Sequence, residues 1–132
     1  DPERPKKNRK ENYVQRFRSI VGTQIKRDMS MVVGEYQDLM MEKIWTHIEK
    51  TLGYDAEALC EHLEAQFTVH MNWDNHLRST KGFRWEMDHV IPRSKLKYDS
   101  LIHPNFAKCW DLSNLRPLEH TKNKTRTYGD KD

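Results

Sequence analysis

Apolar residues recur at helical spacing through the first half of the chain, in three separate stripes. The first stripe consists of Val14, Phe17, Val21 and Ile25. The second consists of Val32, Val33, Tyr36, Leu39, Met40, Ile44, Ile48 and Leu52, and the third of Leu59, Leu63 and Phe67. Gly53 stands where a glycine commonly ends a helix, and Asp55 is a suitable N-cap for the next helix. The pattern predicts three amphipathic helices, the last from Asp55 to Phe67, followed by a loop over residues 70–82.

The pattern changes in the second half, where apolar and polar residues alternate with a period of two. Residues 83–91 show this alternation and are rich in aromatic side chains, which predicts a strand. Residues 112–116 alternate again, which predicts a second short strand that Pro117 ends. A short helical turn is expected around residues 105–110, and a short basic helix over residues 119–127. The sequence therefore predicts an α+β protein, with helices first and a β, loop, β, α unit after them.

Charge is distributed unevenly along the 132 residues, although the formal net charge is only +3. Residues 1–27 contain nine Lys or Arg against three Asp or Glu, residues 28–77 contain two against ten, and residues 78–132 contain twelve against seven. Basic ends of this kind suit a polyanionic partner, with the acidic middle turned away from it. A basic tail with ordinary solvated faces is the alternative. Residues 1–10, with two prolines and almost no apolar side chains, are predicted to be a flexible basic arm.

The sequence also argues against a membrane-spanning protein and against a protein stabilised by disulfide bonds. The longest apolar runs are three or four residues, far short of the roughly 18 that span a bilayer, and no apolar leader is visible near the N-terminus. We therefore expect a cytoplasmic protein with no membrane partner. The two cysteines, Cys60 and Cys109, are too few for a disulfide framework and form no CxxC zinc motif. Two buried thiols and no structural zinc are expected.

Four polar residues of the C-terminal unit have the chemistry of a hydrolytic metal site. Asp88 and His89 lie in the first predicted strand, Asn114 in the second, and Asn123 on the last predicted helix. A carboxylate and an amide oxygen are hard ligands that suit Mg²⁺, which keeps several waters when it binds. Histidine, with an ordinary pKa of about 6.5, can take a proton from water near neutral pH. Together these groups indicate metal-assisted hydrolysis of a phosphodiester.

The C-terminal unit resembles the HNH endonuclease family, which has the ββα-metal or His-Me finger fold, and it is most similar to small HNH proteins of bacteriophages. The residues that carry the resemblance are Trp85-Glu86-Met87-Asp88-His89-Val90-Ile91-Pro92, Asn114-Leu115-Arg116-Pro117-Leu118 and Asn123-Lys124. Upstream, the matching features are Leu52-Gly53, the helix over residues 55–67, and Met71-Asn72-Trp73-Asp74-Asn75. The resemblance covers about residues 52–128. Residues 12–30 fit it more loosely, and residues 31–51 have no match.

The resemblance implies a domain organisation and a reaction. It implies an HNH nuclease domain over residues 53–132, with the finger itself at about 83–128, packed on an N-terminal helical region over residues 11–52. The implied reaction is hydrolysis of DNA phosphodiester bonds with Mg²⁺ or Mn²⁺, leaving 5′-phosphate and 3′-hydroxyl ends. One finger carries one active site, so a monomer is expected to nick DNA and a dimer to cut both strands. The sequence leaves a homodimer or a larger protein complex open. The expected location is the cytoplasm of a bacterium or of a phage-infected cell.

The resemblance also implies a role for each motif residue. His89 corresponds to the general base that activates the attacking water. Asp88 and Asn123 correspond to the metal ligands. Asn114 corresponds to the middle asparagine of the motif, which ties the long loop to the finger through backbone hydrogen bonds. These four residues are the predicted catalytic residues.

Basic residues near this site are expected to hold double-stranded DNA through its phosphates, without reading its sequence. They are Arg93, Lys95, Lys97, Arg116, Lys122, Lys124 and Arg126, together with Arg16 and Arg18 on the first helix. Glu86 and His120 are further candidates beside the metal. Glu86 shares a strand face with Asp88, although a salt bridge to an arginine is its alternative role, and His120 lies one turn before Asn123.

Two other functions stay open from the sequence alone. A DNA-binding or assembly module with an inactive finger would have the same fold, and an RNA-directed nuclease would use the same chemistry. Plasmid nicking in the presence of Mg²⁺ separates the first from an active DNA endonuclease. Cleavage of labelled RNA beside DNA separates the second.

Overall fold

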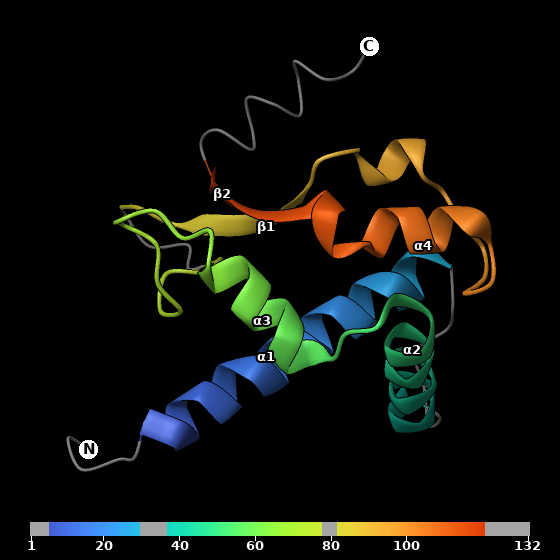
Figure 1. The fold of residues 1–132 in the computed structure, drawn as a ribbon, viewed down its shortest axis with the longest axis horizontal. Helices are drawn as coiled ribbons and strands as arrows, with labels where there is room; N and C mark the ends of the chain where they lie inside the picture. Colours follow the sequence, from blue (N-terminus) through green and yellow to red (C-terminus); the bar gives the residue numbers. More distant parts are fainter. Residues whose placement is uncertain (1–5, 30–36, 78–81, 121–132) are drawn as a thin grey trace.

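The computed structural model describes residues 6–29, 37–77 and 82–120, which form an α+β fold with four α-helices and a two-stranded antiparallel sheet (Figure 1). Its elements are α1 (Lys6–Asp28), α2 (Gln37–Leu52), α3 (Ala56–Glu64), β1 (Trp85–His89), the 3-10 helix η1 (Arg93–Lys95), α4 (Pro104–Trp110), the 3-10 helix η2 (Leu112–Asn114) and β2 (Leu115–Glu119). The predicted α+β class is confirmed, and so is the short helix between the strands.

The first helix begins earlier than the sequence indicated. Residues 6–10, predicted as part of a flexible arm, instead form the first turns of α1. The ammonium of Lys10 lies 3.0 Å from the carboxylate of Glu57 on α3, so this basic turn meets an acidic helix distant in sequence. Residues 1–5 of the predicted arm lie outside the described part of the chain.

The three N-terminal helices contribute residues of the predicted stripes to one hydrophobic cluster. Its members on these three helices are Phe17, Val21, Ile25, Met41, Ile44, Trp45, Ile48, Ala56, Leu59, Cys60 and Leu63. Val32, Val33 and Tyr36 of the second stripe lie outside the described residues. Gly22 has a packing role, because a Cβ at this position would collide with the Met41 sulfur across the contact between α1 and α2. Residues 31–51, which matched nothing in the resemblance, therefore include a helix that completes the core.

The predicted helix boundaries between α2 and α3 are confirmed by their capping bonds. Gly53 has φ of +79° and donates its N–H to the carbonyl of Ile48 at 3.1 Å, so it ends α2 in the left-handed region that glycine favours. Asp55 caps α3, because its Oδ1 accepts the N–H of Ala58 at 2.8 Å. The end of α3 comes at Glu64, three residues before the predicted end.

The second strand differs from its prediction over residues 112–116. It begins and ends later and contains Pro117, which was predicted to end it. His120 N–H donates to the carbonyl of Arg84 at 2.9 Å, and hydrogen-bonded pairs alternate with open pairs along an antiparallel ladder. Pro117 faces Met87 in an open pair. Its missing N–H therefore removes no bond between the strands.

The segment before β1 joins the sheet to the helices. Asn72 Oδ1 accepts the N–H of Asn75 at 3.1 Å and closes a turn. The turn presents Trp73, whose ring stacks on Tyr13 of α1 with centroids 4.4 Å apart. Trp85 N–H donates to the carbonyl of Asn75 at 3.2 Å, so the same turn borders the start of β1.

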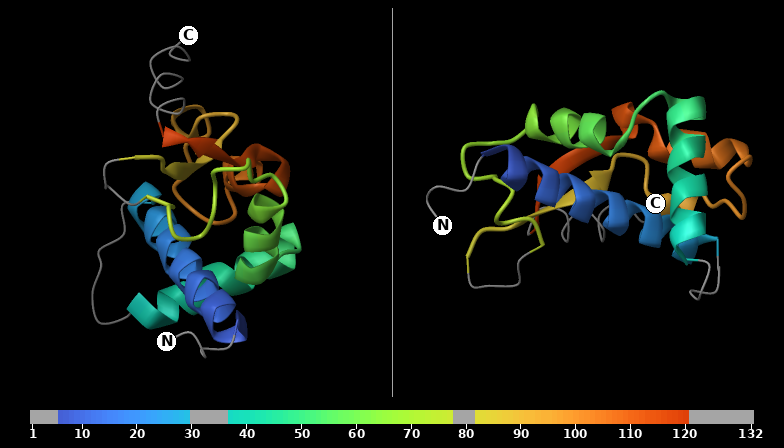
Figure 2. Two further views of the ribbon diagram at one scale, coloured as in Figure 1. Left: turned by 90° about the vertical axis from the view of Figure 1, so that its left-hand side faces the viewer. Right: turned by 90° about the horizontal axis from the view of Figure 1, so that it is seen from below.

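The helices support the pair of strands β1 and β2, called the hairpin below, from one side. α1 contacts both α2 and α3, α3 packs against β2, and α2 contacts α4. In Figure 1 and in the left view of Figure 2, the hairpin lies above α1. Glu119, where the last predicted helix begins, is instead the last residue of β2. Residues 121–127 of that predicted helix lie outside the described residues. Within the described ranges, no helix has the length and apolar character that crossing a bilayer requires.

Candidate functional site

Asn114 joins the two ends of the long connection between the strands. Its side-chain oxygen accepts the N–H of Ile91 at 2.7 Å, and its amide nitrogen donates to the carbonyls of Ile91 at 3.3 Å and Cys109 at 3.0 Å. Its own carbonyl accepts the N–H of Val90 at 2.8 Å. Asn114 is 5% exposed. These are bonds of the kind that the resemblance implies for Asn114, and they fix the chain directly after His89.

Asp88 has a buried carboxylate and lies on β1, just before the residues that Asn114 bonds. It is 5% exposed, and its Oδ2 accepts a hydrogen bond from Nε of Arg116 at 2.9 Å. The two residues face each other in the strand register. A buried carboxylate needs a cationic partner, because burial alone would disfavour its charged form. Arg116, predicted to contact DNA, therefore has an internal role in holding Asp88.

His89 lies on the other face of β1, since successive strand residues point to opposite sides. Its ring is 8% exposed and meets the ring of Trp110 edge-on, with centroids 4.7 Å apart. It lines a pocket of about 280 Å³ whose walls also include Phe17 and His76. The structure thus gives the predicted base a packed wall and open space beside it, and places the predicted metal ligand Asp88 on the opposite face.

Glu86 and His120 form a polar group on the Asp88 face of the hairpin. Glu86 Oε2 lies 2.8 Å from Nδ1 of His120, and Arg84 donates to Nε2 of the same ring at 2.5 Å. Because arginine can only donate, we assign the ring proton to Nδ1, from where it is donated to Glu86. The imidazole of His120 is therefore held from both sides.

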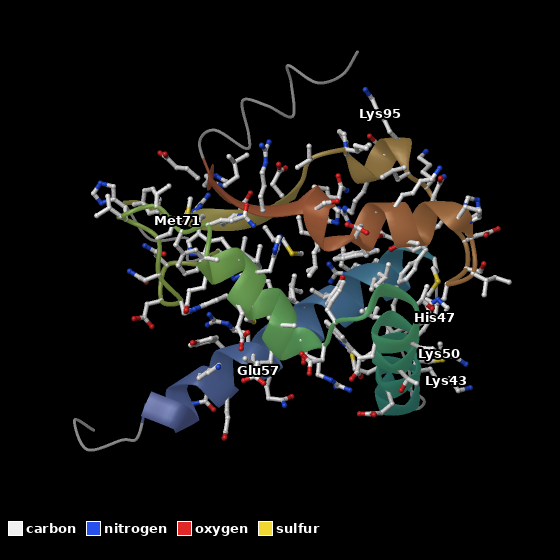
Figure 3. The ribbon with its side chains drawn as sticks, in the orientation of Figure 1. Lys43, His47, Lys50, Glu57, Met71 and Lys95 are labelled. Atoms are coloured by element: carbon white, nitrogen blue, oxygen red, sulfur yellow. The ribbon has the colours of Figure 1, made fainter. Side chains whose placement is uncertain are left out.

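Three of the other arginines predicted to bind DNA make contacts inside the protein. The pairs are Arg16 with the carbonyl of Trp73 at 2.8 Å, Arg18 with Glu42 at 2.7 Å, and Arg93 with Asp28 at 3.1 Å. Lys95 and Lys97 are exposed, and Lys95 projects from η1 away from the helices (Figure 3). The predicted ligand Asn123 lies outside the described residues, as do Lys122, Lys124 and Arg126.

A buried polar network beside the site was not foreseen from the sequence. Trp110 Nε1 donates to the hydroxyl of Tyr98 at 2.9 Å, and that hydroxyl donates to Asp28 Oδ2 at 2.6 Å. Burial and the carboxylate together raise the pKa of Tyr98, so its hydroxyl keeps its proton. Asp28 is the last residue of α1. Its partner stands 70 residues away, which no local pattern reveals.

His76 is a second residue that the sequence analysis missed. Its ring lies between Phe17, at 4.6 Å between centroids, and Trp85, at 4.5 Å. Burial, with a smaller effect from the charge of Arg16, lowers the pKa of His76 from 6.5 to about 4. The ring is therefore neutral at pH 7, and it lines the same pocket as His89.

Of the two predicted metal ligands, Asp88 lies within the described residues. Within the described ranges, no group of three His, Cys, Asp or Glu side chains could hold an ion. Asp88 offers a carboxylate oxygen that suits a hard cation, whereas Cys60 and Cys109 are buried free thiols, as predicted. Burial raises the pKa of both thiols to about 12, so neither is a thiolate near neutral pH. Comparisons with protein-family models, with curated proteins and with solved structures found no match.

Proposed function

We propose that this protein is a metal-dependent endonuclease that hydrolyses phosphodiester bonds of double-stranded DNA with a ββα-metal finger. The observation that carries the proposal is the bonding of Asn114. An asparagine with only a turn-forming role would need no burial and no bonds to two separate carbonyls, yet Asn114 is 5% exposed and makes both. These bonds, with those to Val90 and Ile91, hold the chain directly after Asp88 and His89, where such a finger needs a fixed path.

His89 is the group that would accept a proton from the attacking water. Histidine is the side chain suited to proton exchange near neutral pH. The edge contact with Trp110 restricts the orientation of the ring, and the pocket beside it leaves room for water. Orientation of the base in advance lowers the entropic cost of the reaction.

Asp88 and Asn123 are the residues that would hold Mg²⁺ or Mn²⁺. When bound, such an ion would stabilise the negative charge of the transition state and of the departing 3′ oxygen. Arg116 would keep the carboxylate of Asp88 in place at the hairpin. The proposed products carry a 5′-phosphate and a 3′-hydroxyl, and one finger would cut one strand at a time.

The faces of β1 set a condition for this reaction. Asp88 and His89 extend from opposite sides of the strand. A phosphate that both residues reach must therefore lie beyond the C-terminal end of β1, next to Val90 and Ile91, whose N–H groups Asn114 accepts. We expect DNA to approach the hairpin at that end.

One observation favours a second candidate, a DNA-binding module with an inactive finger. The carboxylate of Asp88 already accepts a hydrogen bond from Arg116. A carboxylate has several acceptor positions, so this bond leaves room for a metal, but a strong ion pair would also compete with one. The two candidates differ in cleavage and agree in DNA binding.

Nicking of supercoiled plasmid separates the candidates. We expect cleavage with Mg²⁺ or Mn²⁺, weaker cleavage with Zn²⁺, and none in excess EDTA. Asp88→Asn and Asn123→Ala should each reduce the rate, and Asp88→Asn should reduce it more because it removes the formal charge. Asp55→Asn is the matched control, since asparagine also caps a helix. Strong cleavage in EDTA would contradict the metal site, and cleavage of labelled RNA in preference to DNA would contradict the substrate.

A further inference from the structure

A second pocket, of about 570 Å³, lies next to the one that contains His89. Arg93 lines both pockets, so the two meet at its side chain. The other polar residues of the second pocket include Asp28, Ser94, Lys97 and His103. This pocket plays no part in the chemistry proposed above.

Asp28, one of the two acidic residues that line this pocket, is already compensated. Asp28 Oδ1 accepts bonds from Gln24 and Arg93, each at 3.1 Å, and its Oδ2 accepts the hydroxyl of Tyr98 at 2.6 Å. A carboxylate with these three donors has little capacity left for a ligand. Asp28 therefore orients the wall of the pocket and does not repel an anion as an isolated charge would.

The donors that remain face the pocket with no described acceptor. No ion pair joins Lys97 to any residue of the described ranges, and Arg93 has five N–H groups, of which one bond to Asp28 is observed. His103 Nδ1 accepts the N–H of Asn105 at 3.0 Å, so its neutral ring carries the proton on Nε2. The exposed carboxylate of Asp99, also in the lining, is screened by solvent.

We propose that this second pocket binds a backbone phosphate that flanks the scissile one. The inference rests on the proposed function, because it takes DNA as the substrate. Arg93, Ser94, Lys97 and the Nε2–H of His103 would donate to the anionic phosphate oxygens. These are positioning residues that fix the register of the strand relative to His89. Lys97 is the residue to test, since its side chain is exposed and its loss should leave the fold intact.

Binding to a short DNA duplex, measured in EDTA so that no cleavage occurs, tests this proposal directly. Lys97→Gln should weaken binding at low salt and reduce the slope of log affinity against log salt by about 0.9, the value for one phosphate contact. Lys97→Arg should restore the slope. Lys50→Gln is the matched control, because Lys50 lies on α2, far from Lys95 of η1 in Figure 3. Equal slopes for Lys97→Gln and Lys50→Gln would overturn the proposal.

Neutral methylphosphonate linkages, introduced one at a time, locate the phosphate. At one position flanking the cut, the substitution should weaken binding of the wild type and have no further effect on Lys97→Gln. Equal losses for both proteins at every position would overturn the subsite even if the protein cleaves DNA. The expected pattern in a protein that never cleaves would uphold the subsite and contradict the nuclease.

Discussion

The helical platform, formed by α1, α2 and α3, and the strand connection, residues 90–114, are stabilised by different interactions. The platform consists of apolar stripes that meet in one cluster, with polar groups at the helix ends. The connection also buries apolar side chains, but its path is set by polar groups. Asn114 makes three side-chain bonds across it, and Tyr98 links Trp110 to Asp28.

The difference predicts two kinds of response to mutation. Apolar burial is strong but non-directional, so its loss lowers stability without specifying one geometry. Hydrogen bonds contribute less net free energy, but a buried group left without its partner is costly, and the bonds fix positions. Truncation in the platform should therefore cost mainly stability, whereas changes in the connection should cost mainly the position of Asp88 and His89.

The largest expected effect is in the platform. Phe17 is fully buried against Trp73, His76 and Trp85. Phe17→Ala should lower the free energy of unfolding by about 3–5 kcal/mol, measured by urea denaturation. Val69→Ala is the control, because Val69 is 91% exposed and its truncation should have almost no effect. Equal losses in the two variants would contradict the placement of the core.

The next effect depends on pH and concerns His76. Its folded pKa, about 4, lies below the usual 6.5, so between these values the unfolded chain binds a proton that the folded protein does not. The stability contribution of His76 is complete above pH 6.5 and declines by about 3 kcal/mol as the pH falls to 4. The unfolding free energy of His76→Gln, measured across this window beside the wild type, should depend less steeply on pH. Parallel curves would show that the ring titrates normally.

A smaller loss of stability is expected in the connection, with a larger loss of geometry. Asn114→Ala leaves the N–H of Ile91 and two carbonyls without their partner and should cost about 2–3 kcal/mol. At temperatures where the variant is folded, its plasmid-nicking rate should still fall. Thr51→Ala is the control, because Thr51 makes one exposed side-chain bond, to His47 within α2. Wild-type nicking by folded Asn114→Ala would contradict the proposal that the hydrogen bonds of Asn114 position Asp88 and His89.

The smallest expected effect is the loss of the Asp55 cap in the platform, and its size can be compared with the effect of losing Asn114. Asp55→Ala removes the cap of α3 and should cost about 1 kcal/mol, read from the urea midpoint. Asp55→Asn should be nearly neutral, since it keeps an acceptor for the N–H of Ala58. A cost for Asp55→Ala as large as that for Asn114→Ala would remove the contrast between the two regions.

The sequence predicted the platform better than the hairpin, for a physical reason. Helical stripes and caps are local patterns, so Phe17, Gly53 and Asp55 could be assigned from their neighbours alone. The extent of β2 depends on which partner each residue faces, and only the register shows that Pro117 falls in an open pair. Residues 6–10 were misjudged because the acids that meet Lys10 lie on another helix.

The sequence names candidates for the site but does not predict how they are arranged. The motif named Asp88, His89 and Asn114, and the structure adds their partners. Trp110 beside His89 and Arg116 beside Asp88 follow from tertiary packing, which local sequence does not encode. His76 gave no signal, because a buried neutral histidine is recognised only from what surrounds it.

The central claim is that His89 performs the chemistry of DNA cleavage, and a single-turnover measurement tests it most directly. Wild type and His89→Ala should bind the same duplex with similar affinity, while the cleavage rate of His89→Ala should fall by about 10²–10⁴-fold, the usual contribution of a general base. His70→Ala, an exposed histidine removed as a control, should cleave at the wild-type rate. Cleavage by His89→Ala at the wild-type rate would contradict the account.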